Sequence, residues 1–377
     1  MTIGLLKEPS PETRVSLLPE HIILLRKMGV SVIVEDGAGI KAFFENDVYV
    51  SAGAVVESRQ HVLKDADLLL SINILPDEDI ALTRNGAIIL GNYQPLFNAD
   101  LMKHWATKML TVFSIDMIPR TTRAQSMDVL SSQANIAGYK AVLLAANMFP
   151  RYFPMFMTAA GSIPPAKVLI LGAGVAGLQA IATARRLGAV VEVFDTRPAV
   201  KEEVNSLGAK FIEVEGAADA SKAGGYAVEQ LPEFLEKQKQ KIAESVAKAD
   251  IVITTAQIPG KKAPLLITSA MIGKMKNGSV IIDLAASTGG NTSLTKRDVT
   301  VVHNGVSIVG NSRLAASMPS DASKLYGKNI LNFMQLFIKD AKIDLNFEDD
   351  LVKGTCITHD GAITNDRVAA LAQQVSF

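Results

Sequence analysis

A glycine-rich turn constrains the fold of this chain more than any other feature. Residues 172–177 read Gly-Ala-Gly-Val-Ala-Gly and fit the pattern G-x-G-x-x-G. The apolar run Lys167–Leu171 before the turn predicts a strand, and residues 177–187 after it predict a helix. A second strand, Val190–Phe194, leads to Asp195, about 20 residues beyond the turn. Together these segments predict a βαβ unit of the kind that binds dinucleotides.

The residue types in this unit suit a dinucleotide. Three glycines would allow a tight turn, a close approach of the backbone to a pyrophosphate, and close packing of helix on strand. Asp195 would accept hydrogen bonds from ribose hydroxyls and repel a 2′-phosphate, which favours NAD over NADP, although Arg197 could soften that preference. The predicted NAD(H)-binding residues here are Gly172, Ala173, Gly174, Val175, Ala176, Gly177, Asp195, Thr196, Arg197, Thr255 and Ala256.

A second glycine turn matches the pattern less well. Residues 36–42 follow the predicted strand Ser31–Glu35, and Glu57 lies about 20 residues on. However, Ala42 stands in place of the third glycine, and residues 45–47 interrupt the following helix early. A plain turn in a related, non-binding α/β unit is the favoured interpretation.

Short apolar runs alternate with amphipathic stretches along the whole chain, which is typical of βα units with a parallel sheet. We predict an α/β fold with two Rossmann-like domains, mostly parallel sheets and a cleft between the domains. The first domain would comprise residues 1–130 with 325–377, and the NAD(H)-binding domain residues 131–324. Expected strands are 2–6, 31–35, 68–71, 87–91, 109–114, 167–171, 190–194, 251–255, 280–283 and 306–310, and expected helices are 19–28, 134–148, 177–187, 231–248 and 322–339.

Charge and cysteine content exclude several classes of protein. The 38 basic and 38 acidic side chains balance, which argues against a nucleic-acid binder or a protein docked on anionic lipid. A single cysteine, Cys356, excludes a disulfide framework and a four-cysteine zinc site. The first residues lack the features of a signal peptide, and the most apolar run, residues 168–184, is too short to span a bilayer. We expect a cytoplasmic protein without direct membrane insertion.

The chain carries little recognisable acid–base equipment. None of its five histidines lies in a catalytic motif, and His303, beside a possible strand, is more typical of a structural histidine. No histidine or cysteine pair has metal-ligand spacing, and no G-x-S-x-G motif occurs.

Long ungapped segments resemble the NAD(H)-binding alpha subunits (domain I) of proton-translocating NAD(P) transhydrogenases. The resemblance begins at residues 7–9 and runs almost to the C-terminus. The segments that carry it are 120–139, 158–166, 172–177, 223–227, 258–261, 281–285, 289–291 and 354–362.

This resemblance implies that Arg120, Gln125, Asp128 and Ser131 gather around the nicotinamide end of NAD(H). The residue types suit that role, because Arg and Ser can hydrogen-bond a carboxamide, Gln can bridge ribose hydroxyls, and Asp can hold Gln or Arg in place. Composition alone would favour a polar domain linker. Tyr226 resembles the tyrosine of the family's mobile loop that closes over the nucleotide, the alternative being an exposed loop aromatic.

The resemblance also implies a reaction that needs no acid or base. Hydride would pass directly between NADH on this chain and NADP⁺ on a partner, so the protein has only to bring two rings together and exclude water. The implied partners are an NADP(H)-binding subunit and a membrane-spanning subunit that couples transfer to proton translocation. A homodimer, held peripherally at the inner membrane through those partners, is also implied.

Two alternatives remain open. The chain resembles alanine dehydrogenases at residues 12–14 and in its Rossmann half, but Ser71 and Asn73 stand where that family carries a substrate lysine. No histidine occurs near Asn92, and Ser287 replaces an expected acidic residue and is given no role. The other alternative, a non-catalytic NAD-sensing subunit, would not require so many side chains to order the nicotinamide.

Overall fold

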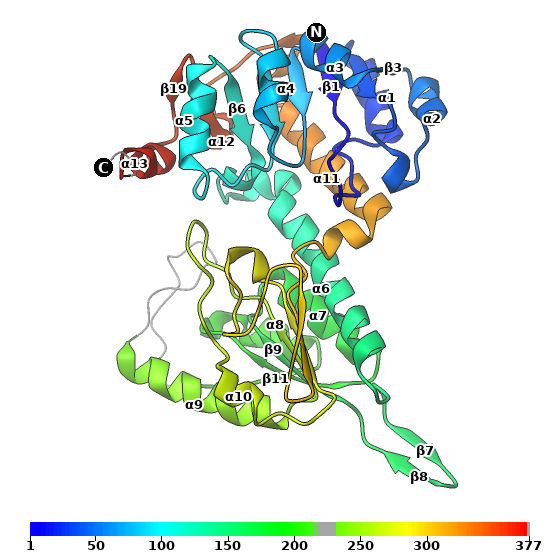
Figure 1. Cartoon of the computed structure of the whole chain (residues 1–377), viewed down its shortest axis with the longest axis vertical. Coiled ribbons are helices and arrows are strands. Elements are labelled where there is room, and N and C mark those ends of the chain that lie inside the picture. Colours follow the sequence, from blue (N-terminus) through cyan, green and yellow to red (C-terminus); the bar gives the residue numbers. More distant parts are fainter. Residues whose placement is uncertain (215, 217–230, 375–377) are drawn as a thin grey trace. The chain divides into compact units, whose positions relative to one another are not determined.

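Two compact units make up the computed structural model, which describes residues 1–214, 216 and 231–374 (Figure 1). Unit 1 comprises Met1–Gln133 and Ala316–Phe377, and unit 2 comprises Ala134–Ala315. Each unit is built on a large, mostly parallel sheet, which confirms the predicted α/β fold class. In the described part of the chain, no helix is both long enough and apolar enough to cross a membrane.

Unit 1 contains an eight-stranded sheet in the order β19-β18-β6-β5-β4-β1-β2-β3. The strands β1 to β6 pair in parallel, and β18 and β19 extend the β6 edge in antiparallel fashion. The bounds are β1 (Thr2–Leu5), β2 (Ser31–Glu35), β3 (Val55–Glu57), β4 (Leu68–Leu70), β5 (Ile88–Gly91), β6 (Thr111–Ser114), β18 (Cys356–His359) and β19 (Ala362–Ile363).

Helices cover both faces of this sheet, so its central strands are buried on both sides and consist of continuous apolar residues. In β4, Leu68 and Leu70 face the core formed with α1 and α11, whereas Leu69 faces the core formed with α3, α5 and α13. The helices are α1 (Pro19–Lys27), α2 (Asn46–Ser51), α3 (Arg59–Asp65), α4 (Asp77–Leu82), α5 (Ala99–Thr107), α11 (Pro319–Met334), α12 (Asp350–Thr355) and α13 (Asp366–Gln374).

Unit 2 contains a seven-stranded sheet in the order β11-β10-β9-β12-β13-β15-β14, parallel except for the β14–β15 pair. The chain runs outward from β9 to β10 and β11 and then crosses to β12 on the other side of β9. This reversal makes a topological switch point beside the carboxyl end of β9, where ligands bind in open α/β sheets. The bounds are β9 (Lys167–Leu171), β10 (Val190–Phe194), β11 (Lys210–Phe211), β12 (Ile251–Thr254), β13 (Val280–Asp283), β14 (Thr300–His303) and β15 (Val306–Val309).

The helices of unit 2 also cover two faces, α6, α7 and α8 on one and α9 and α10 on the other. Their bounds are α6 (Val129–Met148), α7 (Val175–Arg186), α8 (Lys201–Ser206), α9 (Pro232–Lys248) and α10 (Ser269–Ile272). The boundary between the units falls within α6.

Three local expectations differ from the structure. The helix expected from residue 134 begins at Val129, because the Asp128 carboxylate caps its first turn. The helix expected to reach residue 339 ends at Met334, and the chain continues as a hairpin of β16 (Ile338–Lys339) and β17 (Lys342–Ile343). The proline-rich segment after α6 contains a second, projecting hairpin, β7 (Phe156–Thr158) and β8 (Gly161–Ile163) (Figure 1).

Candidate functional site

The glycine turn at residues 172–177 connects β9 to α7, and its glycines are required for different reasons. Gly172 has φ +107°, and a Cβ on it would lie 2.3 Å from Thr255 Oγ1. A Cβ on Gly177 would lie 1.9 Å from the Gly172 carbonyl oxygen. By contrast, a Cβ on Gly174 would meet no described protein atom within 4 Å. Protein packing thus explains the first and third glycines, and the close approach of a ligand explains the second.

The start of α7 suits an anion. Gly174 occupies the N-cap position, and in the described chain no side chain caps this end and no acidic residue lies in the first turn. The first N–H groups of a helix have no partner within the helix, and the helix dipole adds positive potential there. These groups can therefore hydrogen-bond a phosphate. The sequence-predicted residues Val175 and Ala176 supply part of this helix start.

Thr255 and Ala256 lie across the switch point from the glycine turn. Thr255 donates its backbone N–H to the Leu171 carbonyl at 2.9 Å and its hydroxyl to the Gly172 carbonyl at 3.0 Å. Asn291 holds Ala256 from both sides, accepting its N–H at 3.1 Å and donating to its carbonyl at 2.8 Å. The structure therefore brings both predicted residues beside the turn.

The positioning role of Asn291 was missed by the sequence reasoning, although the Gly-Gly-Asn segment was one of the resembling segments. The Asp283 carboxylate, fully buried at the end of β13, accepts the Asn291 N–H at 2.7 Å and so fixes the segment that clamps Ala256.

Asp195 lies directly after β10 and next to the turn. Its Oδ2 accepts the backbone N–H of Ala173 at 2.7 Å, and its Oδ1 accepts that of Arg197 at 2.8 Å. The Arg197 guanidinium also pairs with the carboxylate, with Nη2 2.7 Å from Oδ2. The hydrogen bond to Asp195 is the main reason why the pKa of Arg197 is raised above its ordinary value. The predicted residues Ala173, Asp195 and Arg197 thus form one cluster, with Thr196 between the last two in sequence.

The four residues predicted to contact the nicotinamide lie in unit 1. Arg120 and Gln125 are exposed, beside and within the 3₁₀ helix Thr122–Met127. Asp128 accepts hydrogen bonds from the Ser131 N–H at 2.9 Å and the Ser131 hydroxyl at 2.6 Å. Asp128 and Ser131 are therefore brought together as the cap of α6, while the exposure of Arg120 and Gln125 gives them no role in the core. Tyr226 lies outside the described residues.

Two asparagines of α11 anchor this loop, a role that the sequence reasoning missed. Asn329 and Asn332 both donate their side-chain N–H groups to the Ser126 carbonyl, at 2.8 and 2.9 Å. They are three residues apart on a helix and so lie on one face, which is the only sequence signal that could have indicated a shared partner.

A second polar cluster lies within unit 1, after the carboxyl ends of β1 and β4. The buried Glu8 carboxylate accepts the N–H groups of Ile72 at 2.5 Å and Asn73 at 3.2 Å, and burial raises the pKa of Glu8 to about 7. Arg14 is held by Glu12, with Nη2 2.7 Å from Oε2, and donates to Gln133 Oε1 at 2.8 Å. The charge of Arg14 is therefore compensated within the protein.

Glu8→Gln should remove a pH dependence of stability. The folded protein holds a proton on Glu8 up to about pH 7, whereas a glutamate with its ordinary pKa of 4.5 loses it earlier. The free energy of unfolding of the parent chain should therefore fall as pH rises from 4.5 to 7, by up to about 3 kcal/mol. Urea unfolding at pH 5 and pH 8 should show a smaller pH difference in the variant. Equal pH differences in the two proteins would contradict a raised pKa.

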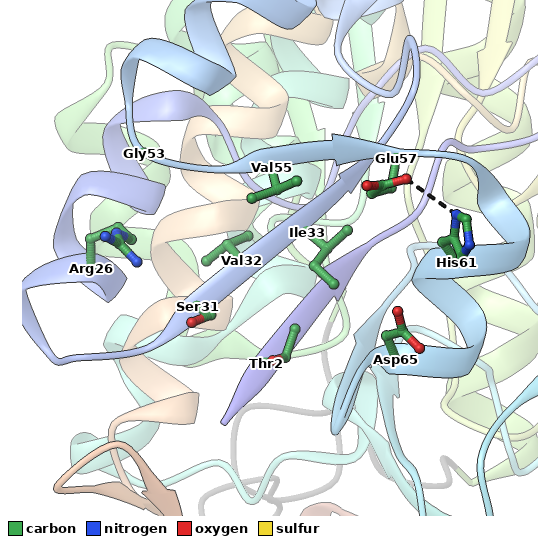
Figure 2. Close-up of a pocket in the computed structure, with 10 residues that line it drawn as sticks. All are labelled: Thr2, Arg26, Ser31, Val32, Ile33, Gly53, Val55, Glu57, His61 and Asp65. Atoms are coloured by element: carbon green, nitrogen blue, oxygen red, sulfur yellow. Dashed lines mark ion pairs between the residues drawn. The ribbon is translucent and has the colours of Figure 1, made fainter.

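The weaker glycine turn, at residues 36–42, has a packing explanation. A Cβ on Gly39 would lie 2.5 Å from the Tyr49 ring and 2.6 Å from the Phe44 carbonyl oxygen. The segment after it is the three-residue 3₁₀ helix Ile40–Ala42 rather than an α-helix. Glu57, the acidic residue at the fingerprint distance, pairs with His61 at 3.2 Å (Figure 2).

A pocket in unit 1 includes this Glu57–His61 pair and is unrelated to the predicted site (Figure 2). It contains Thr2 and Ser31, the first residues of β1 and β2, and ligands of open α/β sheets bind at the opposite, carboxyl ends of strands. No predicted site residue lines it; the lining residues are Thr2, Arg26, Ser31, Val32, Ile33, Gly53, Val55, Glu57, His61 and Asp65.

Comparison with protein-family models matches nearly the whole chain. Residues 4–137 match the alanine dehydrogenase/PNT N-terminal domain, and residues 141–366 match the C-terminal domain of the same family.

Known proteins similar to the chain carry two kinds of name. An NAD(P) transhydrogenase subunit alpha from Rhodospirillum rubrum is 46% identical over 97% of this chain and 98% of its own length. A solved transhydrogenase structure from Sinorhizobium meliloti is 44% identical, with a TM-score of 0.88 over 96% of this chain and 100% of that chain. An alanine dehydrogenase from Staphylococcus haemolyticus is more distant, 27% identical over 89% of this chain and 87% of its own length.

Proposed function

The chain belongs to the alanine dehydrogenase/PNT family, and on this premise we propose that it is the NAD(H)-binding alpha subunit of a proton-translocating transhydrogenase. The proposal includes direct hydride transfer between NADH on this chain and NADP⁺ on a partner subunit. A membrane-spanning partner subunit would couple that transfer to proton movement and hold this chain at the inner membrane. A homodimer of the chain is included in the same proposal.

One observation carries the NAD(H) component of the proposal: Gly174 has no packing reason to be glycine. The residue sits at the uncapped start of α7, beside a switch point and between two glycines that the backbone needs. A dinucleotide pyrophosphate explains all three positions together, because it requires free N–H groups and a backbone without a Cβ.

The chain's own residues would then bind and orient the nucleotide. The N–H groups at the start of α7 would hold the pyrophosphate, and the Asp195 carboxylate would accept from the adenosine ribose. Arg120 and Ser131 would hydrogen-bond the carboxamide, Gln125 would bridge ribose hydroxyls, and Asp128 would keep Ser131 in place. When bound, NADH supplies the hydride from its nicotinamide ring. A transfer between two such rings moves no proton, so no residue has to act as an acid or base.

Contacts in unit 1 argue against amino-acid oxidation. Ser71 and Asn73 stand where alanine dehydrogenases carry a substrate lysine, and both are occupied by internal partners. The Ser71 hydroxyl hydrogen-bonds the Tyr93 hydroxyl at 2.9 Å, and the Asn73 side chain donates to Glu8 at 2.8 Å. With Arg14 also paired to Glu12, these side chains stabilise the core of unit 1 rather than present a site for a free amino acid.

Mixing the purified chain with the NADP(H)-binding and membrane-spanning subunits of a transhydrogenase tests the proposal. NADH-dependent reduction of an NADP⁺ analogue, absent without this chain, is the expected result. The chain alone, given alanine and NAD⁺, should form no NADH above background. NADH binding without transfer under any of these mixtures would favour the sensing alternative, and NADH formation from alanine would favour the dehydrogenase.

A further inference from the structure

The Asp195 carboxylate is surrounded by N–H donors. The backbone N–H groups of Ala173 and Arg197 lie 2.7 and 2.8 Å from its oxygens. The Arg197 guanidinium adds Nε at 2.9 Å and Nη2 at 2.7 Å. A carboxylate offers about four lone-pair positions, so four donors saturate it. Only 6% of the Asp195 side chain is exposed, which leaves little room for a further donor.

Only one of these donors can leave without rearranging the turn. The Ala173 and Arg197 N–H groups belong to backbone segments that the sheet holds, since Gly172 donates its own N–H to the Phe194 carbonyl at 2.8 Å. The guanidinium stands on a flexible side chain, and 18% of the Arg197 side chain is exposed. A ribose hydroxyl that donates to Asp195 must therefore displace the guanidinium.

We propose that Arg197 is a specificity-determining residue that competes with the nucleotide ribose for Asp195 and, once displaced, offers a cation to a 2′-phosphate. The inference rests on the proposed NAD(H) site. The Arg197–Asp195 contact opposes binding of NAD(H), because binding breaks a two-point ion pair. It simultaneously weakens discrimination against NADP(H), because a freed guanidinium at the ribose pairs well with phosphate.

The two effects of Arg197 act in opposite directions on the two nucleotides, which makes them separable from a general loss of fold. Removing the guanidinium should tighten NADH binding and weaken NADPH binding. A substitution that merely damages the turn would weaken both. Replacing Arg197 with Lys keeps a cation but loses the forked, two-point contact, so it should tighten NADH binding while retaining more of the NADPH affinity.

Titration calorimetry with NADH and NADPH on the intact chain tests the inference. For Arg197→Ala we expect the NADH Kd to fall about fivefold and the NADPH Kd to rise about tenfold, as expected when a charge-assisted contact of about 1 kcal/mol or more is removed. Arg197→Lys should fall between the parent and Arg197→Ala in its ratio of NADPH to NADH dissociation constants. Arg186→Ala, which removes an exposed cation from α7 of the same unit, should leave both constants unchanged.

The outcomes separate this inference from the proposed function. A parent chain that binds NADH, with an unchanged or smaller NADPH-to-NADH ratio of dissociation constants in both Arg197 variants, overturns the inference alone. A parent chain that binds neither nucleotide overturns the proposed function and the inference with it. If Arg197→Ala unfolds at a lower temperature than the parent, the comparison between the parent and Arg197→Lys decides.

Discussion

Gly174→Ala is expected to raise the NADH Kd at least about thirtyfold while leaving the protein folded. A new Cβ at this position meets no described protein atom within 4 Å, and the backbone there, with φ −79°, is acceptable to any residue. The loss of affinity follows because the Cβ would project where the pyrophosphate must approach the backbone, at a cost of about 2 kcal/mol or more. Fluorescence titration with NADH and thermal unfolding of the same sample measure both quantities.

Gly177→Ala provides the contrast, because the same added methyl group has nowhere to go. Its Cβ would lie 1.9 Å from the Gly172 carbonyl oxygen and 2.9 Å from the carbonyl carbon, both backbone atoms. Either β9 or α7 must shift, and overpacking of this kind costs about 3 kcal/mol or more of unfolding free energy. Thermal unfolding should therefore begin well below the parent's transition in Gly177→Ala but not in Gly174→Ala.

Gly39→Ala is a matched control in the other glycine turn. It too should destabilise the protein, since the Cβ would lie 2.5 Å from the Tyr49 ring, but the folded fraction should bind NADH with the parent's affinity. Parent-like NADH binding by Gly174→Ala would remove the pyrophosphate from this turn. A loss of NADH affinity in folded Gly39→Ala would instead place a nucleotide at the turn of unit 1.

The periodicity of the chain was sufficient to predict the α/β class, because parallel strands covered on both faces leave continuous apolar runs in the sequence. The residues of β4 and β12 are such runs, and every one of them is buried. The edge strands β3 and β11 gave no such signal, since edge residues are partly exposed and these strands are two or three residues long. The hairpin of β7 and β8 was missed for the same reason, because all of its residues are exposed.

The candidate site divides in a similar way. The glycine turn and Asp195 were identifiable because a local backbone geometry restricts which residues can occupy each position. The pairing of Asp195 with Arg197 was not, because only side-chain conformation decides whether an arginine two residues away turns toward the carboxylate. The raised pKa of Glu8 depends on Ile72 and Asn73, more than 60 residues along the chain, so no local pattern could reveal it. The predicted domain limits and nicotinamide contacts stay predictions.

Arg120→Ala and Gln125→Asn should each slow hydride transfer by about a hundredfold while changing the NADH Kd much less. Both side chains are exposed, so their replacement should leave unit 1 folded. Their proposed role is to fix the rotation and position of the nicotinamide, and a displacement of about 1 Å between reacting groups can cost about 10²-fold in rate. Single-turnover transfer from NADH to an NADP⁺ analogue on the partner subunit measures the rate, and calorimetry measures the affinity.

Arg123→Ala is the control for this loop, because it removes the same type of side chain three residues from Arg120. The Arg123 guanidinium contacts Asp349, with Nη1 2.7 Å from Oδ2, and pairs with Asp350 at the surface of unit 1. Exposed ion pairs of this kind contribute about 1 kcal/mol or less to stability. Transfer by Arg123→Ala should therefore match the parent. If Arg123→Ala slows transfer as much as Arg120→Ala, the effect belongs to the position of the loop, and Arg120 does not orient the nicotinamide.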